Sequence, residues 1–345
     1  MAVNEINAAQ VIPGAYITLI EKDSYPDASL GQAAVTNAVY ALVTLLQQGV
    51  IGVIGDVTSS WTALSALMTS ALELPQCSFT ASSVSFSDKG QFKYFFRTIP
   101  TDVVMIDAML RFVVYQGWTK IGVIYSDDSL GQQLYQRVIQ QTEVMNIQLI
   151  NYQSFPSTTS TPTSDEMKTS LDSLSNNGAR VILLAATGQI QSDLLVQAAV
   201  AGYLSSEYTW LLVDDDATSY LQETIDTYNN NTHSTNNTRQ LSLKSDFNGL
   251  IYFTNWLTLN GYPPYDKFLS SWSHLDSNVL AYSCLMMMAN GFQNILRPST
   301  NHTDGLLQLA SGNLGDFLTP QAFNTGYVGP DGPMQLDANG DMMAG

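Results

Sequence analysis

The sequence predicts an α/β fold with a doubly wound parallel sheet, and two observations carry this prediction. Short apolar runs alternate with longer segments in which apolar residues recur every three or four positions, the difference between strand and helix periodicity. The chain has 345 residues, 45 % of them hydrophobic, which allows two ordinary domains with a core each. Strands separated by single helices need right-handed crossovers and therefore form parallel sheets covered on both faces.

The expected elements follow from this alternation in chain order. A strand over 15–20 precedes a helix over 30–46, whose apolar residues are spaced by three and four. Val50-Ile-Gly-Val-Ile54 is a continuous apolar run, which is typical of a buried strand. The later elements are helix 60–72, strand 76–79, helix 103–115, strand 121–125, helix 131–143, strand 147–152, helix 164–174, strand 181–184, helix 190–201, strand 210–213, strand 249–253 and helix 276–296.

Two polar segments interrupt the pattern. Residues 154–164 are rich in Ser, Thr and Pro, and residues 227–240 are rich in Asn and Thr, so both are expected to be surface loops. N-glycosylation sequons begin at Asn230, Asn236 and Asn301, about as many as chance provides in this composition. Their number is therefore uninformative, although two of them fall in the second polar segment and fit a glycoprotein.

The charge balance excludes one class of partner. Thirteen Lys and Arg residues stand against 30 Asp and Glu, a net charge of −17. Such a chain repels phosphate backbones, so nucleic-acid binding is excluded as a main function and anionic membrane surfaces are disfavoured.

Cysteine content and hydropathy constrain the class of protein further. Cys77 and Cys284 are too few for a disulfide scaffold or a thiolate metal cluster, and their apolar neighbours predict two free thiols in the core. The longest apolar stretch, Val279 to Met288, is shorter than a membrane span. Residues 1–7 lack the basic and apolar regions of a signal peptide, so any targeting segment is expected to lie outside this chain.

No pattern of residues supports catalysis. The sequence contains no phosphate-binding glycine loop and no G-x-S-x-G nucleophile motif, and its three His residues are scattered. Asp337-Ala-Asn-Gly-Asp341 lacks the Glu that a calcium loop requires, so a simple turn is expected there. We therefore expect no enzyme activity, no cofactor and no metal site. Asp214-Asp-Asp216 follows a strand, at the sheet edge where open α/β folds bind ligands.

Several motifs, in the same order as in a known family, cover nearly the whole chain. They are Gly55-Asp-Val-Thr-Ser-Ser60, Leu74-Pro-Gln76, Thr80-Ala-Ser-Ser83, Phe86-Ser-Asp-Lys89, the segment from Tyr94 to Asp102, the segment from Gly117 to Asp128, Asp276-Ser-Asn-Val-Leu-Ala-Tyr282 and the segment from Thr325 to Asp341. Together they resemble the Venus flytrap ligand-binding region shared by class C G-protein-coupled receptors, natriuretic-peptide receptors and bacterial amino-acid-binding proteins, a type I periplasmic-binding-protein-like fold.

The resemblance implies two doubly wound lobes joined by three hinge crossings, with the ligand in the cleft between them. Lobe I would hold about residues 1–117 and 249–315, and lobe II about residues 118–248 and 316–345. Residues 2–7 resemble the end of the family's first helix, which implies that the first strand is missing from this chain.

The resemblance also implies ligand-binding residues in lobe I. Ser59 and Ser60 begin a helix whose free amides favour an anion such as an α-carboxylate, although simple helix capping explains them too. Thr80 and Ser82 match the family's second hydroxyl position, and their alternative is an ordinary polar loop. Lys22 resembles a basic position that pairs with a distal acidic group, and its alternative is an exposed lysine.

Two carboxylates complete the implied site. Asp102 and Asp215 resemble the pair that holds the α-ammonium, with helix capping as the alternative for Asp102 and Asp214 as an alternative for Asp215. Leu130 replaces a cleft Tyr of glutamate-type receptors, which argues against glutamate itself.

The expected function is an extracellular, non-enzymatic domain of a class C-like receptor that binds an amino acid or related zwitterion. Closure of lobe II onto lobe I would be the signal, driven by tighter binding to the closed form. The resemblance implies a homo- or heterodimer through lobe I and an attached transmembrane domain outside this chain. The main alternative is a soluble solute-binding protein that delivers an amino acid to a transporter. A peptide-binding receptor or a ligandless dimerisation domain remains a further alternative.

Overall fold

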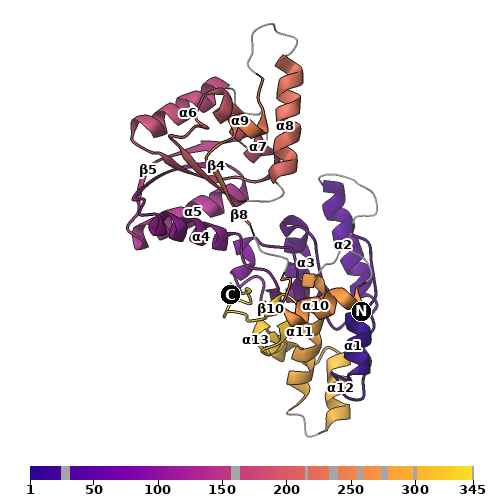
Figure 1. Ribbon diagram of the computed structural model, residues 1–345. Helices are drawn as coiled ribbons and strands as arrows, with labels where there is room; N and C mark the ends of the chain where they lie inside the picture. Colours follow the sequence, from indigo (N-terminus) through magenta and orange to yellow (C-terminus); the bar gives the residue numbers. More distant parts are fainter. Residues whose placement is uncertain are drawn as a thin grey trace. The chain divides into compact units, whose positions relative to one another are not determined.

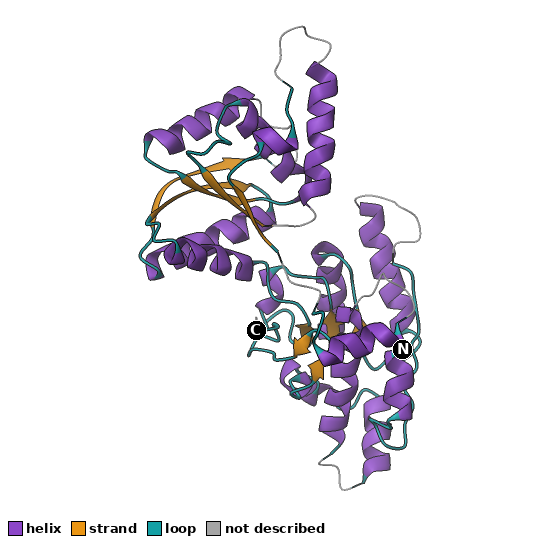
Figure 2. Ribbon diagram, viewed as in Figure 1, coloured by secondary structure: helices purple, strands orange, loops and turns teal. Residues whose placement is uncertain are grey.

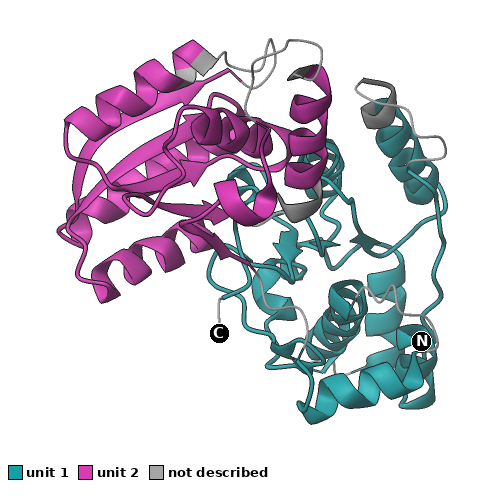
Figure 3. Cartoon of the chain, turned by 45° about the horizontal axis from the view of Figure 1, so that its top comes forward, with its two compact units in different colours: residues 1–101, 256–345 teal, residues 102–255 magenta. Residues whose placement is uncertain are grey.

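The computed structural model describes residues 1–24, 32–156, 164–213, 217–232, 240–254, 259–272, 279–297 and 301–343. The chain divides into two compact units (Figure 3). Unit 1 holds residues 1–101 and 256–345, and unit 2 holds residues 102–255. Each unit has a parallel sheet of its own, as the sequence predicts.

Unit 2 is built on a five-stranded sheet in which every neighbouring pair is parallel. The strands are β4 (Lys120–Ser126), β5 (Gln148–Phe155), β6 (Val181–Ala185), β7 (Thr209–Val213) and β8 (Leu250–Phe253), in the order β5-β4-β6-β7-β8. The chain thus starts at an inner strand and winds out in both directions, which is doubly wound topology.

Helices cover both faces of this sheet (Figures 1 and 2). The helices of unit 2 are α4 (Val103–Tyr115), α5 (Ser129–Val144), α6 (Ser164–Asn176), α7 (Gly188–Val200), α8 (Ala217–Thr232) and the short α9 (Leu243–Asp246). Along β6, Ile182 and Leu184 belong to one core cluster, whereas Val181 and Leu183 belong to the other. This alternation explains why the strand is apolar throughout, because both of its faces are buried.

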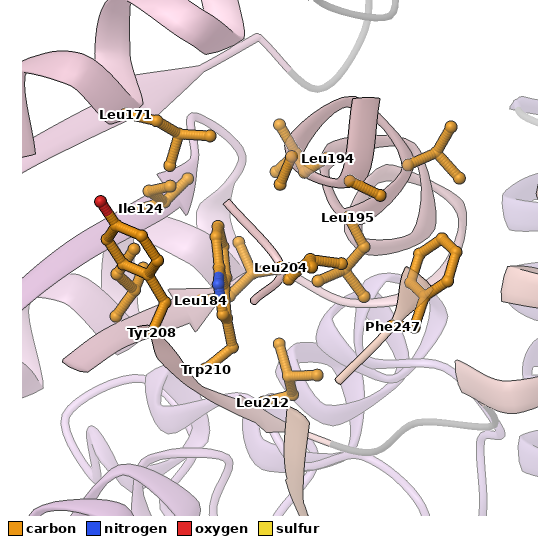
Figure 4. Close-up of a cluster of buried hydrophobic side chains, with 14 of the residues drawn as sticks. Ile124, Leu171, Leu184, Leu194, Leu195, Leu204, Tyr208, Trp210, Leu212 and Phe247 are labelled. Atoms are coloured by element: carbon orange, nitrogen blue, oxygen red, sulfur yellow. The ribbon is translucent and has the colours of Figure 1, made fainter. Parts of the chain in front are cut away.

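One of these clusters, on the side of α6 and α7, surrounds the buried Trp210 of β7 (Figure 4). The Trp210 indole packs among Leu184, Leu204 and Tyr208, and its Nε1–H donates to the Tyr203 carbonyl at 3.0 Å. The ring therefore fills the core without leaving a buried donor unpaired.

Unit 1 has a smaller sheet of three parallel strands, in the order β1 (Val53–Ile54), β2 (Gln76–Ser78) and β3 (Phe95–Arg97). Its helices are α1 (Ala2–Ala8), α2 (Gln32–Leu46), α3 (Ser59–Ala71), the 3₁₀ helix η1 (Val84–Ser87), α10 (Pro263–Ser271), α11 (Val279–Leu296), α12 (His302–Ala310), the 3₁₀ helix η2 (Gly315–Phe317) and α13 (Pro320–Phe323). An antiparallel hairpin of β9 (Val328–Gly329) and β10 (Gly332–Pro333) lies near the end of the chain.

Helix α11 is the core helix of unit 1. By length and mean hydropathy it could cross a membrane, contrary to the expectation that the apolar stretch is too short, but 56 % of it is buried within the fold. Met287, Phe292 and Leu296 contribute to a core cluster that also contains Cys77 of β2. These contacts make α11 part of the core of unit 1.

The structure also corrects the expectation that the two cysteines are free thiols. Cys77 and Cys284 are not free thiols: they form a disulfide with a Cα–Cα distance of 5.8 Å. Sequence spacing does not predict this pairing, because 207 residues separate the two cysteines and packing of α11 against β2 brings them together.

The expected strand at 15–20 is wrong. Its residues join no sheet, and Tyr16 and Leu19 are exposed. The Asn7 side chain instead pairs with both backbone groups of Ile17, accepting from its N–H and donating to its carbonyl at 2.8 Å each. The polar segment expected over 227–240 also begins later, because α8 continues to Thr232, and residues 233–239 lie outside the described part.

The unit boundaries differ from those that the resemblance implies. Helix α4 packs against α5 and belongs to unit 2, so this unit begins at residue 102 rather than at about 118. The chain after residue 316 stays in unit 1, where Asp331 accepts from Ser283 and Asp341 pairs with Arg97. The two units meet in the sequence at residues 101–102 and 255–256, and the number of hinge crossings stays a prediction of the resemblance.

Candidate binding site

The first part of the site is the N-terminus of α3, which follows β1 at the carboxyl edge of the unit 1 sheet. Thr58 is the N-cap residue, and its Oγ1 accepts from the Trp61 N–H at 3.3 Å. Ser59 and Ser60 follow as the first two helical residues, and their N–H groups have no acceptor among the described residues. These amides and the helix dipole favour an anion at this position.

The second part is the loop after β2, which lies against the first. The Thr80 hydroxyl donates to the Asp56 carbonyl at 3.2 Å, and the Ser83 N–H donates to Ser59 Oγ at 3.3 Å. Ser82 is half-buried in the same loop. The structure thus brings Ser59, Thr80 and their neighbours together in unit 1.

The hydroxyls differ in what they can still offer to a ligand. Because Ser59 Oγ accepts from Ser83, its own hydrogen remains available for donation to a carboxylate. Thr80 already donates its hydrogen to Asp56, so its oxygen is available as an acceptor. The exposed Ser60 shares a hydrogen bond of 3.1 Å with Thr58.

Sequence reasoning missed a carboxylate in this region. Asp56 precedes α3 and is half-buried, and its Oδ1 accepts from the Val57 N–H at 2.8 Å and from Ser24 Oγ at 3.0 Å. Its position directly after a strand, at the edge where α/β sheets bind ligands, was the signal that could have identified it.

Lys22 is exposed and lies two residues before Ser24, whose contact with Asp56 brings this segment to the site. Trp61 is half-buried in the first turn of α3.

The two predicted carboxylates fall within the residue range of unit 2. Asp102 stands at the N-cap position of α4 in unit 2, without a side-chain capping bond. Asp215 lies outside the described residues, as does the alternative Asp214. Leu130 packs against the core cluster of unit 2 that lies between the sheet and helices α4 and α5.

The unit 1 cluster combines two kinds of group. Free amides and the Ser59 hydroxyl suit a carboxylate, whereas Asp56 and the Thr80 oxygen suit an ammonium. Within the described ranges, no three His, Cys, Asp or Glu side chains are grouped so that they could hold a metal ion.

Comparison with known proteins gives one family match over the full chain. The family described as the receptor family ligand binding region matches residues 1–345. Among curated relatives, the chain is 26 % identical over 182 residues to metabotropic glutamate receptor-like protein E of Dictyostelium discoideum, covering 52 % of this chain and 22 % of that protein. It is 22 % identical over 360 residues to glutamate receptor 3.4 of Arabidopsis thaliana, covering 98 % of this chain and 35 % of that protein.

A shorter match is 30 % identical over 138 residues to the extracellular calcium-sensing receptor of Sus scrofa, covering 40 % of this chain and 12 % of that protein. The chain therefore spans about a third or less of these relatives. Among solved structures, an ABC transporter substrate-binding protein of Desulfitobacterium hafniense in complex with Leu has a TM-score of 0.70 at 16 % identity, covering 99 % of this chain and 88 % of that one. This similarity shows the fold alone, with parallel sheets of the type I periplasmic-binding-protein kind.

Proposed function

Since the chain belongs to the receptor family ligand binding region, we propose that it is the extracellular domain of a receptor and binds an α-amino acid or a related zwitterion. This function requires no catalysis, because the family and its structural neighbours are receptors or substrate-binding proteins. The glutamate-receptor-like and calcium-sensing relatives support the receptor assignment.

One observation carries the choice of ligand class. Asp56 lies three residues before Ser59 at the start of α3, and the loop that follows β2 contacts both residues: Thr80 donates to the Asp56 carbonyl, and the Ser83 N–H donates to Ser59 Oγ. An anionic ligand without an ammonium would be repelled by the Asp56 carboxylate, and a simple cation would be repelled by the α3 dipole. A zwitterion satisfies both groups, with its carboxylate on Ser59 and its ammonium towards Asp56.

The disulfide supports the extracellular part of the proposal. Disulfides form and persist in oxidising compartments and are rare in the cytosol. The Cys77–Cys284 bridge is buried in unit 1 and joins a strand to the core helix. Attachment to a transmembrane domain, dimerisation through lobe I, ligand-driven lobe closure and contributions from Asp102, Asp215 and Lys22 remain predictions of the resemblance.

The second candidate is a solute-binding protein that delivers an amino acid to a transporter, favoured by the full-length structural match to a substrate-binding protein. The coding sequence after Gly345 discriminates the two: a membrane span supports the receptor, and a stop codon supports the carrier.

The binding proposal is tested by titration calorimetry of the folded protein with glycine, L-leucine and L-glutamate. Ser59→Ala removes a hydrogen bond to a charged group, worth about 1.5–3 kcal/mol, and should weaken binding of whichever amino acid binds by about 10- to 100-fold. Ser270→Ala, at an exposed serine near the end of α10, is the matched control and should leave affinity unchanged. Equal affinities for Ser59→Ala and wild type would contradict the site.

A further inference from the structure

Arg97 is a fully buried cation at the end of β3, outside the groups that the proposed ligand touches. Each of its three side-chain nitrogens lies within 3.2 Å of an acceptor. Nε donates to Asp341 Oδ1 at 2.8 Å, while Nη1 donates to the carbonyls of Ala81 and Ser83 at 3.0 and 2.7 Å. A buried guanidinium is tolerated only with such complete pairing.

The counter-charge comes from a turn near the end of the chain. Asp337 Oδ1 accepts from the N–H groups of Asn339 and Asp341, which closes the turn, and the Gly340 carbonyl accepts from the Arg97 N–H at 3.1 Å. Asp341 is 8 % exposed and its carboxylate lies 2.7 Å from Arg97 Nη2. Residues 337–341 resemble part of a calcium loop in sequence. In the structure the last carboxylate of this turn, Asp341, pairs with Arg97 instead.

This ion pair is connected to the candidate site through the loop of residues 79–83. The two carbonyls that Arg97 holds belong to Ala81 and Ser83, which flank Ser82. The N–H of the same Ser83 donates to Ser59 Oγ. The 3₁₀ helix η1, which follows the loop, is held by the same ion pair. Ser87, its last residue, accepts from Arg97 Nη2 at 3.2 Å and donates to Asp341 Oδ2 through its Oγ.

We propose that Arg97 and Asp341 are positioning residues for the ligand site: the C-terminal turn 337–341 fixes Arg97, and Arg97 fixes the hydroxyl-bearing loop 79–83 against α3. The effect on ligand affinity rests on the proposed function, whereas the effect on the loop does not. Asp341 touches no ligand group in this account and acts only through Arg97. The C-terminal turn is therefore a place from which the site can be tuned without altering any residue in contact with the ligand.

The test is hydrogen–deuterium exchange of the unliganded protein with Asp341→Asn, which keeps the shape of the side chain and removes its charge. Exchange of residues 79–87 should become about tenfold faster, while α11 and unit 2 keep the wild-type rate. Asp107→Asn is the matched control, because it breaks the bidentate Arg137 ion pair of unit 2. This control variant should leave the exchange rate of residues 79–87 at the wild-type value. If Asp341→Asn does not fold, Ser87→Ala should give a smaller increase over the same residues.

Unchanged exchange in residues 79–87 would overturn the proposal, and so would a uniform increase throughout unit 1, since the latter is ordinary destabilisation. Affinity is the second readout: Asp341→Asn should weaken binding of glycine, L-leucine or L-glutamate by about tenfold at a temperature where it stays folded. Faster loop exchange with unchanged affinity overturns the positioning role. If none of the three probes binds the wild type, only the proposed function fails, and the exchange experiment still decides whether the ion pair fixes the loop.

Discussion

Asp331 illustrates how a single buried carboxyl responds to its surroundings. It lies in the turn of the β9–β10 hairpin, and its Oδ1 accepts from Ser283 Oγ at 2.6 Å. Its Oδ2 is buried and has no hydrogen-bond partner among the described residues. Burial raises the pKa of Asp331 to about 6, and the hydrogen bond from Ser283 opposes this shift only in part. The charged form is therefore disfavoured in the folded state.

This shift gives a pH prediction. Between pH 3.8 and about 6 the folded protein binds more protons at Asp331 than the unfolded chain does, so this group lowers the free energy of unfolding as pH rises through that window. Asp331→Asn should remove this fall and raise the free energy of unfolding at pH 7 by about 1–3 kcal/mol. Urea unfolding at pH 4 and pH 7 checks it, with the exposed Asp316→Asn as control. An equal loss of stability between pH 4 and pH 7 in wild type and Asp331→Asn would contradict the assignment.

At this scale the sequence predicts residues that act through local chemistry and misses those that depend on long-range contact. Ser59 and Thr80 follow strands, so their arrival at one sheet edge is predictable. The Cys77–Cys284 and Arg97–Asp341 pairs join residues more than 200 positions apart, and one sequence carries no signal for such partners.

Among the elements, β2 and α11 are joined covalently. Because the disulfide closes a loop of about 207 residues, it restricts the unfolded chain strongly. The double variant Cys77→Ala, Cys284→Ala should lose about 2–5 kcal/mol of stability, measured by denaturant unfolding. A stability equal to that of the wild type would show that the bridge does not constrain the unfolded chain in this way.

Two helices of unit 2, α5 and α7, differ in whether the side chain of the N-cap residue makes a capping hydrogen bond. Asp128 caps α5, its Oδ1 accepting from the Gly131 N–H at 2.7 Å, whereas Thr187 occupies the same position of α7 without a side-chain cap. Asp128→Ala should lower the free energy of unfolding by about 1 kcal/mol and Thr187→Ala by clearly less, as thermal unfolding would measure. Equal losses would contradict the capping role of Asp128.

The sequence predicts the positions of helices and strands well where apolar residues recur with a clear period, and poorly where that period is weak. The central strands of unit 2 and helix α4 lie where the sequence places them. Residues 15–20 have strand-like composition, but Asn7 supplies the hydrogen bonds of Ile17 in place of a neighbouring strand. This pairing of Ile17 with a side chain depends on where α1 packs, and the spacing of apolar residues does not predict that packing.

For the whole molecule, the sequence predicts the fold class and the family resemblance predicts two parallel-sheet lobes. The compact units have other boundaries than the lobes that the resemblance implies, since Asp341 and Asp331 hold the C-terminal segment on unit 1. The family match over residues 1–345 then shows a receptor ligand-binding region, and the zwitterionic ligand remains our proposal from the groups around Ser59 and Asp56.

The proposed site is expected to recognise both charges of an α-amino acid. The most direct test measures thermal unfolding of the protein with each of the common L-amino acids, and then with the deaminated and decarboxylated analogues of any that binds. An amino acid at about 100 times its Kd should add about 2.7 kcal/mol of stability, and loss of either charged group should weaken binding by at least about tenfold. Binding of either analogue as tight as that of the parent, or no stabilisation of a well-folded protein by any amino acid, would contradict the account.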